Sequence, residues 1–393
     1  MELALFPHLP TLRIILRALF SRRWFGLRRL AGISLLVAYY LFVITQNWLF
    51  DALDALFFPR AATTPTPAPV IVIAVPRSGT TFLHGLMAQD RARFRFLTMF
   101  DSMFPAVSSR KIYDAFAALD RLIGAPVARL VGAIERAAFA GWDGIHATGL
   151  MRPEEDECLW CFPMLTPAMW LAFPFTEELR HLRYIDLMPA PVRTALTSFL
   201  KRYMSKQAAL DPARRTLLLK NVLLAGRIET VAAAFPDARF IYLVRSPHET
   251  IASGVSMFSR PWRLHSPDLA YNPQATRAWA DLLMDYSDTY DAFVDALPEE
   301  RRFVLDYQRL VAKPSEAVAA IYSHFGWEIE ADFRQALTAA DSRQARFASS
   351  HSYSLEACGL TTEAVDQRMA RFMTRHGFAQ AAQQSAPAEE RIG

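Results

Sequence analysis

The sequence has 393 residues, of which 52% are hydrophobic, so the chain can bury one large core or a core with an appendage. The formal net charge of +4 is uneven, because residues 1–30 carry +5 and the rest of the chain carries −1. The main part of the chain therefore lacks the basic face of a nucleic-acid-binding protein, which excludes nucleic acid as a partner. Three cysteines are too few for a disulfide framework. We interpret Cys158 and Cys161, a single Cys-x-x-Cys pair, as buried thiols rather than a redox or zinc site, and we expect a reducing compartment.

Residues 1–60 predict a helical arm associated with a membrane. In TLRIILRALFSRRWFGLRRL, one helical face carries Leu12, Ile15, Leu16 and Leu19, and arginines take the other, which is typical of a helix at a lipid surface. The arginines of this region are Arg13, Arg17, Arg22, Arg23, Arg28 and Arg29. In the following AGISLLVAYYLFVITQNWLFDALDALFF, Thr45-Gln46-Asn47 interrupts the apolar residues. The uninterrupted run from Leu35 to Ile44 is shorter than the roughly 20 residues that a span requires, and no small-residue cleavage site marks a signal peptide.

Three interpretations of this arm stay open. It is a monotopic or re-entrant membrane helix, a single membrane span, or an amphipathic arm packed on its own domain. A span with cytoplasmic arginines would place the rest of the chain outside. Residues 61–69, AATTPTPAP, predict a stiff linker to the main domain of residues 70–378, and the small polar residues 379–393 are expected to form a disordered tail.

The main domain is expected to have an α/β fold with a doubly wound parallel sheet flanked by helices. Four short apolar runs are typical of buried parallel strands, and helical stretches lie between them. These runs are Val70–Val75, Leu217–Leu219, Phe240–Val244 and Phe303–Leu305. The long insertion between the first and second runs is mostly helical by pattern.

The first run continues into a polar turn and a helix, in VIVIAVPRSGTTFLHGLM. A helix start offers unpaired N–H groups and the positive end of the helix dipole, and Gly79 lets the backbone approach an anion closely. Ser78, Thr80 and Thr81 add hydroxyl donors, and Arg77 adds a fixed positive charge. The turn therefore predicts a P-loop-like anion site; the alternative is an ordinary capped helix after a buried strand.

A second anion site is predicted in FIYLVRSPHETIASGVSM. Nucleoside triphosphatases need Gly-Lys-Ser/Thr and an Asp at a neighbouring strand end to hold phosphates and Mg²⁺. Here Thr80 follows Gly79, and the strand RFIYLV ends in Arg245, which repels Mg²⁺ and attracts an anion. Ser253, expected near the start of the next helix, could join Arg245 on one phosphate; the alternative is a surface arginine that caps this helix. Two anion sites on one sheet imply a nucleotide with phosphate-like groups at both ends, neutralised without a metal.

Both motifs resemble those of a known family. VPRSGTTFLH and YLVRSPHETIAS resemble the sulfate-binding loop and the 3′-phosphate-binding motif of sulfotransferases, enzymes that use 3′-phosphoadenosine-5′-phosphosulfate (PAPS). LDYQRLVAKPSEAVAAIYSHFG and HSYSLEACGL are similar to the C-terminal part of the bacterial and carbohydrate-type branch, so the resemblance spans roughly Val70 to Phe378. By position, it implies that 5′-phosphosulfate is held by Arg77, Ser78, Gly79, Thr80 and Thr81, and 3′-phosphate by Arg245 and Ser253.

Two cations are candidates for catalysis. Sulfuryl transfer builds charge on the bridging oxygen of the donor, so nearby cations lower the barrier. Arg77 is one such group, and Lys220, after the apolar TLLL, is the other, because ligands of such sheets bind at the carboxyl ends of strands. The stretch LLLKN also resembles the family's lysine-bearing strand. The alternative is a lysine that snorkels out of a strand end.

The chain departs from its relatives at the base that would activate the acceptor hydroxyl. Val222 stands where many cytosolic relatives carry a histidine, and Thr98, Met99 and Phe100, followed by Asp101, stand where carbohydrate-type relatives often have a glutamate. We expect the base in GLMRPEEDECLW, where Pro153 can start a helix with an acidic first turn. Glu155 is the first choice and Glu154 the second, since an apolar pocket would raise a carboxyl pKa to a useful value. The alternative is an ordinary acidic helix start; further candidates are Asp101, His146 and His84, of which His84 is expected to pack inside the first helix after the loop.

The sequence thus predicts a PAPS-dependent sulfotransferase that acts on a hydroxyl of a glycan, lipid or other small molecule near a membrane. A metal-dependent kinase with a degenerate loop and a non-catalytic, membrane-associated nucleotide-binding protein are the alternatives. Thirty-eight arginines against five lysines suggest a GC-rich bacterial genome. Because bacteria make this donor in the cytosol, we expect the catalytic domain to face the cytoplasm.

Overall fold

The computed structural model describes residues 7–139, 149–344 and 355–378. The chain forms two compact units. The first comprises Met1–Val72 and Thr81–Phe240, and the second comprises Ile73–Thr80 and Ile241–Gly393. The tail expected at residues 379–393 lies outside the described residues.

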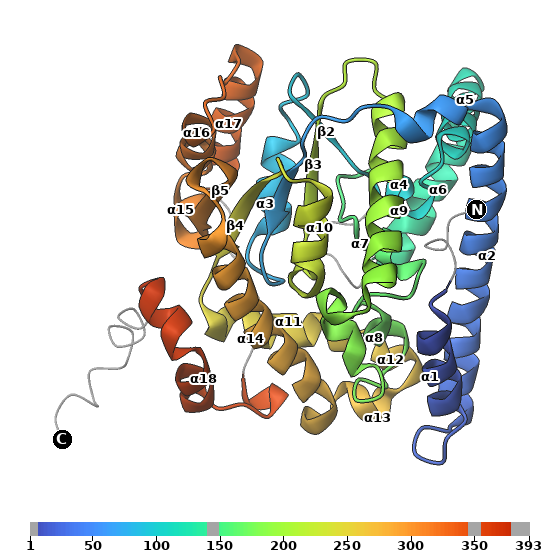
Figure 1. Ribbon diagram of the computed structural model, residues 1–393, viewed down its shortest axis with the longest axis vertical. Helices are drawn as coiled ribbons and strands as arrows, with labels where there is room; N and C mark the ends of the chain where they lie inside the picture. The colour runs from blue at the N-terminus through green and yellow to red at the C-terminus, as the bar shows by residue number, and fades with distance from the viewer. Residues whose placement is uncertain (1–6, 140–148, 345–354, 379–393) are drawn as a thin grey trace. The chain divides into compact units, whose positions relative to one another are not determined.

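The strands form a five-stranded sheet in the order β2-β3-β1-β4-β5 (Figure 1). Their bounds are β1 Val70–Ile73, β2 Phe94–Phe96, β3 Thr216–Asn221, β4 Arg239–Val244 and β5 Arg302–Asp306. β2 and β3 are parallel, with Phe94 opposite Thr216 and Phe96 opposite Leu218. The four predicted strands are confirmed, but β5 is not fully buried as expected, because it lies at the sheet edge and its Val304 is exposed. β2 is an additional strand that the sequence did not predict. The strand order reverses at β1, and such a switch point is where open α/β sheets bind ligands.

Helices of the first unit precede β1 and occupy the long connections between β1, β2, β3 and β4. Their bounds are α1 Leu9–Leu19, α2 Leu27–Phe57, η2 Pro59–Thr63, α3 Thr80–Met87, α4 Met99–Met103, α5 Val107–Leu122, α6 Pro126–Phe139, α7 Glu157–Cys161, α8 Met169–Ala172, η3 Arg180–Arg183, η4 Ile185–Leu187, α9 Ala190–Ala209, η5 Leu224–Arg227 and α10 Ile228–Ala234. The insertion between the first two predicted strands is therefore largely helical, as expected.

Helices of the second unit follow β4 and β5. Their bounds are α11 Pro247–Ser259, α12 Trp262–His265, α13 Pro267–Ala270, α14 Pro273–Ala296, η6 Glu299–Arg301, α15 Tyr307–Ala312, α16 Pro314–His324, α17 Ala331–Gln344, η7 Glu356–Cys358 and α18 Thr362–Arg375. α11, α14 and α18 contact one another, and α16 packs against β5. Phe258 of α11 stacks on the buried Trp279 of α14, so this packing orients the helix that follows β4.

The N-terminal arm is anchored to the rest of the first unit. The backbone N–H of His8 donates to the carbonyl of Pro163, and the Thr11 hydroxyl lies 2.9 Å from a ring nitrogen of His181. Ile15 and Leu19 of the predicted lipid-facing side are buried, whereas Leu16 is 48% exposed. The expectation that these leucines and isoleucine form one lipid face is therefore only partly correct, because these contacts turn part of that face inward.

Helix α2 runs for 31 residues without a break (Figure 1) and is the one described helix that is long and apolar enough to cross a membrane. It continues through Thr45-Gln46-Asn47, where the sequence indicated an interruption. The reason is that Asn47 faces inward, where its amide donates to the carbonyl of Met103 at 3.0 Å. A polar residue with a partner does not interrupt the helix.

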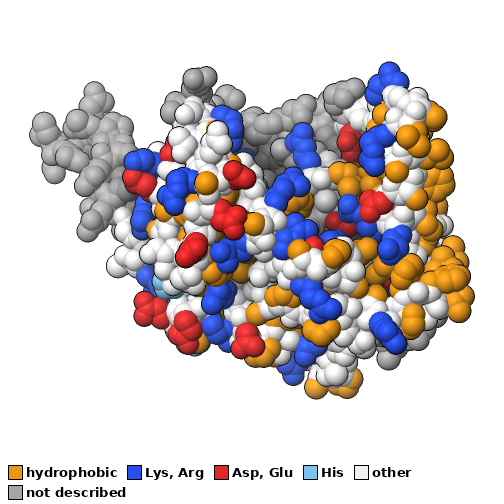
Figure 2. Space-filling model, turned by 90° about the horizontal axis from the view of Figure 1, so that it is seen from above, with side chains coloured by type: hydrophobic (Ala, Val, Ile, Leu, Met, Phe, Trp, Pro, Cys, Tyr) orange, Lys and Arg blue, Asp and Glu red, His pale blue; other side chains and the backbone are white. Residues whose placement is uncertain are grey.

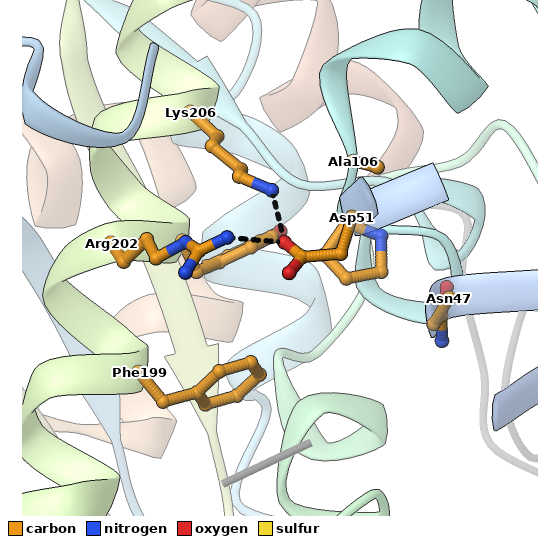
Figure 3. Close-up of a pocket in the computed structure, with 8 residues that line it drawn as sticks. Asn47, Asp51, Ala106, Phe199, Arg202 and Lys206 are labelled. Carbon is orange, nitrogen blue, oxygen red and sulfur yellow. Dashed lines mark hydrogen bonds and ion pairs between the residues drawn. The ribbon is translucent and has the colours of Figure 1, made fainter. Parts of the chain in front are cut away.

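Two aspartates of α2 are buried against α9. Asp51 accepts hydrogen bonds from Arg202 at 2.6 Å and from Lys206 at 2.7 Å (Figure 3). Asp54 pairs with Lys206 at 2.8 Å. Asp54 also accepts from the backbone N–H groups of Val107 and Ser108, which begin α5. These contacts fix the second half of α2. η2, which includes the first three residues of the predicted linker, also packs on α9.

Candidate active site

The turn after β1 has the backbone of an anion-binding loop. Arg77 and Gly79 both adopt left-handed conformations, with φ values of 70° and 88°. Such alternation turns successive N–H groups toward one point and is found where loops bind anions. Helix α3 begins directly afterwards at Thr80, so its free N–H groups and dipole add to the same site.

Ser78 supplies a direct sign of a ligand. Its residue is completely buried, yet its Oγ forms no hydrogen bond with any described residue. A buried hydroxyl without a partner costs about 1–3 kcal/mol, which a bound anion would recover. The residues of the loop therefore fit an acidic group such as a sulfate or phosphate.

Gly79 is required by its neighbour as well as by its backbone. A Cβ at this position would lie 2.7 Å from Cδ2 of Tyr307. Tyr307 is the first residue of α15, directly after β5, and its ring also lies under the Arg245 guanidinium, 4.0 Å from ring centre to Cζ. The sequence analysis missed Tyr307. Its position directly after a strand could have indicated it, because such sheets bind ligands at the carboxyl ends of their strands.

The second unit brings together three of the predicted anion ligands. Arg77 Nε donates to Ser253 Oγ at 2.9 Å, and Arg245 Nη1 donates to the carbonyl of Arg77 at 2.7 Å. Arg245 also pairs with Glu249 at 2.5 Å and is 23% exposed, so it is held in place rather than extended into solvent. Ser253 lies in the middle of α11, not near its start as predicted, and its side chain still contacts Arg77.

The first unit contains the lysine and the carboxylates. Lys220, near the end of β3, has a side chain that is 0% exposed, so it does not snorkel into solvent. Its Nζ lies 3.1 Å from Thr81 Oγ1, 3.4 Å from Glu154 Oε1 and 3.3 Å from Glu155 Oε1. Thr81, which follows Thr80 of the loop, therefore shares a cation with the two predicted base candidates.

No helix starts at Pro153, contrary to the prediction. Pro153 instead forms an antiparallel bridge with Thr98, and the N–H of Glu154 donates to the carbonyl of Leu97 at 2.9 Å. These bonds hold the chain extended, and α7 begins only at Glu157. Glu154 and Glu155 are therefore placed beside Lys220 by strand-like bonding, not by a helix.

A buried polar network supports this acidic segment. Asn221 Nδ2 donates to Asp156 Oδ1 at 2.5 Å and to Glu157 Oε2 at 2.9 Å. Glu157 also pairs with the fully buried Arg227, whose guanidinium lies 4.4 Å from the ring centre of Trp160. Burial raises the pKa of Asp156 to about 6, and the Asn221 hydrogen bond acts in the opposite direction. Sequence reasoning missed this network, although Asn221 directly follows Lys220.

Two other base candidates have structural partners. Asp101 caps α4 together with Thr98 and pairs with Arg110 at 2.9 Å. His84 is buried in α3, as expected, and its ring bonds to the carbonyl of Leu218 at 3.1 Å. Burial, followed by the charge of Lys220, lowers the pKa of His84 to about 4, so the ring is neutral near pH 7. His146 lies outside the described residues.

Cys158 and Cys161 are free thiols. Burial raises the pKa of Cys158 to about 12 and that of Cys161 well above its ordinary value. Neither forms a reactive thiolate at neutral pH. Both residues are half-buried, not fully buried as the sequence suggested.

Comparison with known protein families gives the class of this chain, which is a transferase. A model of the sulfotransferase family matches residues 69–331, so the chain belongs to that family.

Among curated proteins, the chain is similar to omega-hydroxy-beta-dihydromenaquinone-9 sulfotransferase Stf3 of Mycobacterium bovis and of Mycobacterium tuberculosis. Each is 25% identical over 293 residues, which cover 73% of this chain and 70% of the relative. Among solved structures, sulfotransferase STF1 from Mycobacterium tuberculosis has a TM-score of 0.71 at 21% identity and covers 92% of both chains. Sulfotransferase STF9 from Mycobacterium avium has a TM-score of 0.68 at 20% identity, covering 83% of this chain and 81% of the other. These likenesses establish the fold.

Proposed function

We propose that this protein transfers a sulfuryl group from PAPS to a hydroxyl group of a lipid at the cytoplasmic face of a membrane. The observation that carries the proposal is the completely buried Ser78 hydroxyl, which lies without a partner among the described residues in a left-handed loop at a helix start. An anion is the ligand that such a loop favours. Membership of the sulfotransferase family then favours PAPS as the source of that anion.

The chain's own groups have separate roles in binding the donor. The 5′-phosphosulfate is assigned to the N–H and hydroxyl groups of Ser78, Gly79, Thr80 and Thr81, with Arg77 supplying charge. The 3′-phosphate is assigned to Arg245 and Ser253. Arg245 is suited to this role because the Tyr307 ring and Glu249 hold its planar guanidinium in one orientation. Arginine can bind such a group through two parallel N–H donors.

The transfer step needs a cation at the leaving oxygen and a base at the acceptor. The acceptor oxygen forms a bond to sulfur while the bond between sulfur and the donor's phosphate oxygen breaks. We assign stabilisation of that phosphate oxygen to Lys220 and Arg77. Lys220 is desolvated, so its charge acts more strongly there than it would in water.

Glu155 is the proposed base. Its side chain is 18% exposed, against 8% for Glu154, so an acceptor can reach it more easily. Glu154 Oε1 also accepts the N–H of Glu155 at 3.0 Å, which fixes Glu154 as a partner of Lys220. Glu155 would take the hydroxyl proton as the new bond to sulfur forms.

A lipid is the acceptor class that the comparison favours. The relative Stf3 is named for a hydroxylated dihydromenaquinone, an apolar molecule with a terminal hydroxyl. The apolar N-terminal helix of this chain is in keeping with an acceptor drawn from a membrane. A glycan or small soluble acceptor remains the alternative, and a comparison of lipid and soluble acceptors in one assay would distinguish them.

The donor assignment is tested by nucleotide binding to the full-length protein without divalent metal. We expect adenosine-3′,5′-bisphosphate to bind, and the Arg245→Ala variant to bind it about 10–100-fold more weakly, since a charge-assisted hydrogen bond is lost. ADP, which lacks the 3′-phosphate, should bind the variant and the wild-type protein nearly equally. The control is Arg277→Ala, which removes only a surface ion pair with Asp281.

Two results would contradict the proposal. An equal loss of affinity for both nucleotides would remove the 3′-phosphate assignment from Arg245. Binding of ATP that requires Mg²⁺, with no binding of the bisphosphate, would support a kinase in place of a sulfotransferase.

A further inference from the structure

One side of α2 is an exposed apolar stripe. Leu35, Phe42, Leu49 and Leu56 recur every seven residues, or two helical turns, and are 73%, 58%, 53% and 70% exposed. The positions between them on this side are Ala38, Thr45 and Ala52, which are also exposed. The stripe carries no charge along its length, since Asp51 and Asp54 face inward.

Two further helices continue this apolar surface. On α5, exposed positions recur at helical spacing from Ile112 through Phe116 and Leu119 to the tip of the α5–α6 hairpin. The tip residues Leu122 and Ile123 are 83% and 65% exposed. Such large apolar side chains are rarely gathered in water on a monomeric protein without a binding role.

The facing helix of the hairpin has the same character. On α6, Val127, Leu130 and Ile134 are 57%, 61% and 58% exposed, again at spacings of three and four residues. The buried side chain of Asp120 holds the two helices of the hairpin together, since it accepts hydrogen bonds from the N–H groups of Val127 and Ala128 at 2.9 Å each. The apolar exposure is thus built into the fold of the hairpin.

The three helices adjoin within the first unit. α2 contacts α5, and α5 contacts α6. In Figure 1 they lie together at the right margin, and in Figure 2 the side chains along that margin are largely hydrophobic. The exposed stripe and the hairpin therefore belong to one side of this unit.

Bonds along α2 prevent it from crossing a bilayer. Tyr40 donates to the carbonyl of Phe162 at 2.6 Å, Asn47 to that of Met103, and Asp51 holds Arg202 and Lys206. These contacts extend over much of a helix about 45 Å long. If α2 spanned the hydrocarbon, about 30 Å thick, these polar groups of the domain would have to enter it as well. Only the outward side of α2 is free to contact lipid.

Basic side chains border the N-terminal end of this surface. Arg13 and Arg17 of α1, Arg22 and Arg23 of the following turn, and Arg28 at the start of α2 are exposed. A cluster of arginines beside an apolar helix face matches the negative headgroups above an acyl layer. Charge complementarity therefore selects an anionic bilayer as the occupant of the surface.

We propose that the outward stripe of α2 and the α5–α6 hairpin form one docking surface that lies flat in the interface of an anionic lipid bilayer, with the arginines of residues 13–28 at the headgroups. The hairpin tip enters the acyl boundary, and α2 lies in the plane of the membrane. This inference deepens the membrane location proposed above and does not depend on the transfer chemistry. The sequence placed the membrane contact in residues 1–60 alone, and this proposal extends it to residues 112–134.

The test is co-flotation of the full-length protein with vesicles of phosphatidylcholine alone or with about 30% phosphatidylglycerol, because an anionic surface attracts exposed arginines. Wild-type protein should float with the anionic vesicles and much less with the neutral ones. The Phe116→Asp/Leu119→Asp variant should lose at least about tenfold in partitioning, because two charges would enter the apolar layer. The matched control is Leu187→Asp/Leu264→Asp, at sites that are 82% and 79% exposed on η4 and α12, and it should float as the wild type does.

Separate readouts distinguish folding, nucleotide binding and docking. All four substituted side chains are more than half exposed, so thermal unfolding should change little, and bisphosphate binding should persist in the hairpin variant. Amide exchange provides a measurement without substitution, since α5–α6 amides should be protected by anionic vesicles. Wild-type flotation of the hairpin variant would overturn the proposal. So would a concentration-dependent dimer that the hairpin substitutions abolish while no vesicle binding occurs, since a second copy would then be the occupant.

Discussion

At the scale of single residues, Glu155 and Glu154 differ in accessibility although both contact Lys220. We expect Glu155→Gln to lower kcat by about 10²–10⁴-fold, the range for loss of a general base, with little change in donor affinity. Glu154→Gln keeps the shape but weakens the position of Lys220, so its effect should be smaller. Initial rates at saturating donor, with bisphosphate affinity measured in parallel, provide the comparison. Full activity of Glu155→Gln would return the search to Glu154 and Asp101.

Gly79 gives a second residue-scale prediction, since both its φ of 88° and the nearby Tyr307 ring oppose a side chain. Gly79→Ala should lower the melting temperature and weaken bisphosphate binding, because the loop must shift to clear a 2.7 Å contact. Gly85→Ala is the matched control. Gly85 lies in α3 with open space around its Cβ position, so alanine should stabilise that helix by about 0.5–1 kcal/mol. Equal melting temperatures for the two variants would show that the loop tolerates a Cβ.

At the scale of elements, Asp54 joins three helices. It caps α5 through Val107 and Ser108 and neutralises Lys206 of α9. We expect Asp54→Asn to lower the free energy of unfolding by about 3–5 kcal/mol, because it removes a charge from a buried ion pair. Urea denaturation would measure this change. Asp114→Asn, which breaks an exposed pair with Arg110, should cost less than about 1 kcal/mol, and a similar loss in both variants would contradict the argument.

The elements also show what the sequence could predict. Continuous apolar runs identified β1, β3 and β4 because these strands are buried along almost their whole length. The short apolar run of β5 identified the fourth strand, although only its Leu305 is buried. β2 escaped notice because Phe94–Phe96 is short and arginine alternates with phenylalanine in it. The helix expected at Pro153 is wrong because bonds from Leu97 and Thr98, distant in sequence, hold that segment extended.

The candidate site was predictable in part for similar reasons. The loop residues 77–81 and Arg245 follow strand ends, and Lys220 lies near the end of β3. Strand ends can be located from the sequence. Tyr307 and the Asn221 network are known only from side-chain packing. The inward positions of Asp51 and Asp54 likewise depend on Lys206, which lies on a helix about 150 residues away in the chain.

At the scale of the whole molecule, stability should respond to pH through two buried groups with opposite effects. Asp156, with its pKa raised from 3.8 to about 6, keeps its proton in the folded state while the unfolded chain loses it, so stability falls as pH rises through this range. His84, with its pKa lowered from 6.5 to about 4, stays neutral while the unfolded chain gains a proton at low pH. Its contribution therefore rises with pH between about 4 and 6.5, and the two effects nearly cancel.

Replacement of Asp156 should expose the effect of His84. When the pH is raised from 4 to 6.5, the free energy of unfolding of Asp156→Asn should rise by about 3 kcal/mol, whereas that of the wild type should stay nearly constant. The size follows because each pKa unit corresponds to about 1.4 kcal/mol. Urea titrations at several pH values would measure the slope. The same pH slope in the variant and the wild type would show that Asp156 does not hold its proton in the folded protein.

The shared ion pairs of α2 and α9 also decide how the protein must be handled. A shortened protein that starts after residue 60 would lack Asp51 and Asp54. The buried ammonium group of Lys206 would then lose both of its partners, and the first N–H groups of α5 would lose their acceptor. Such a shortened protein should aggregate. The intact chain, purified in a mild detergent with a tag at its C-terminus, is therefore the better starting material.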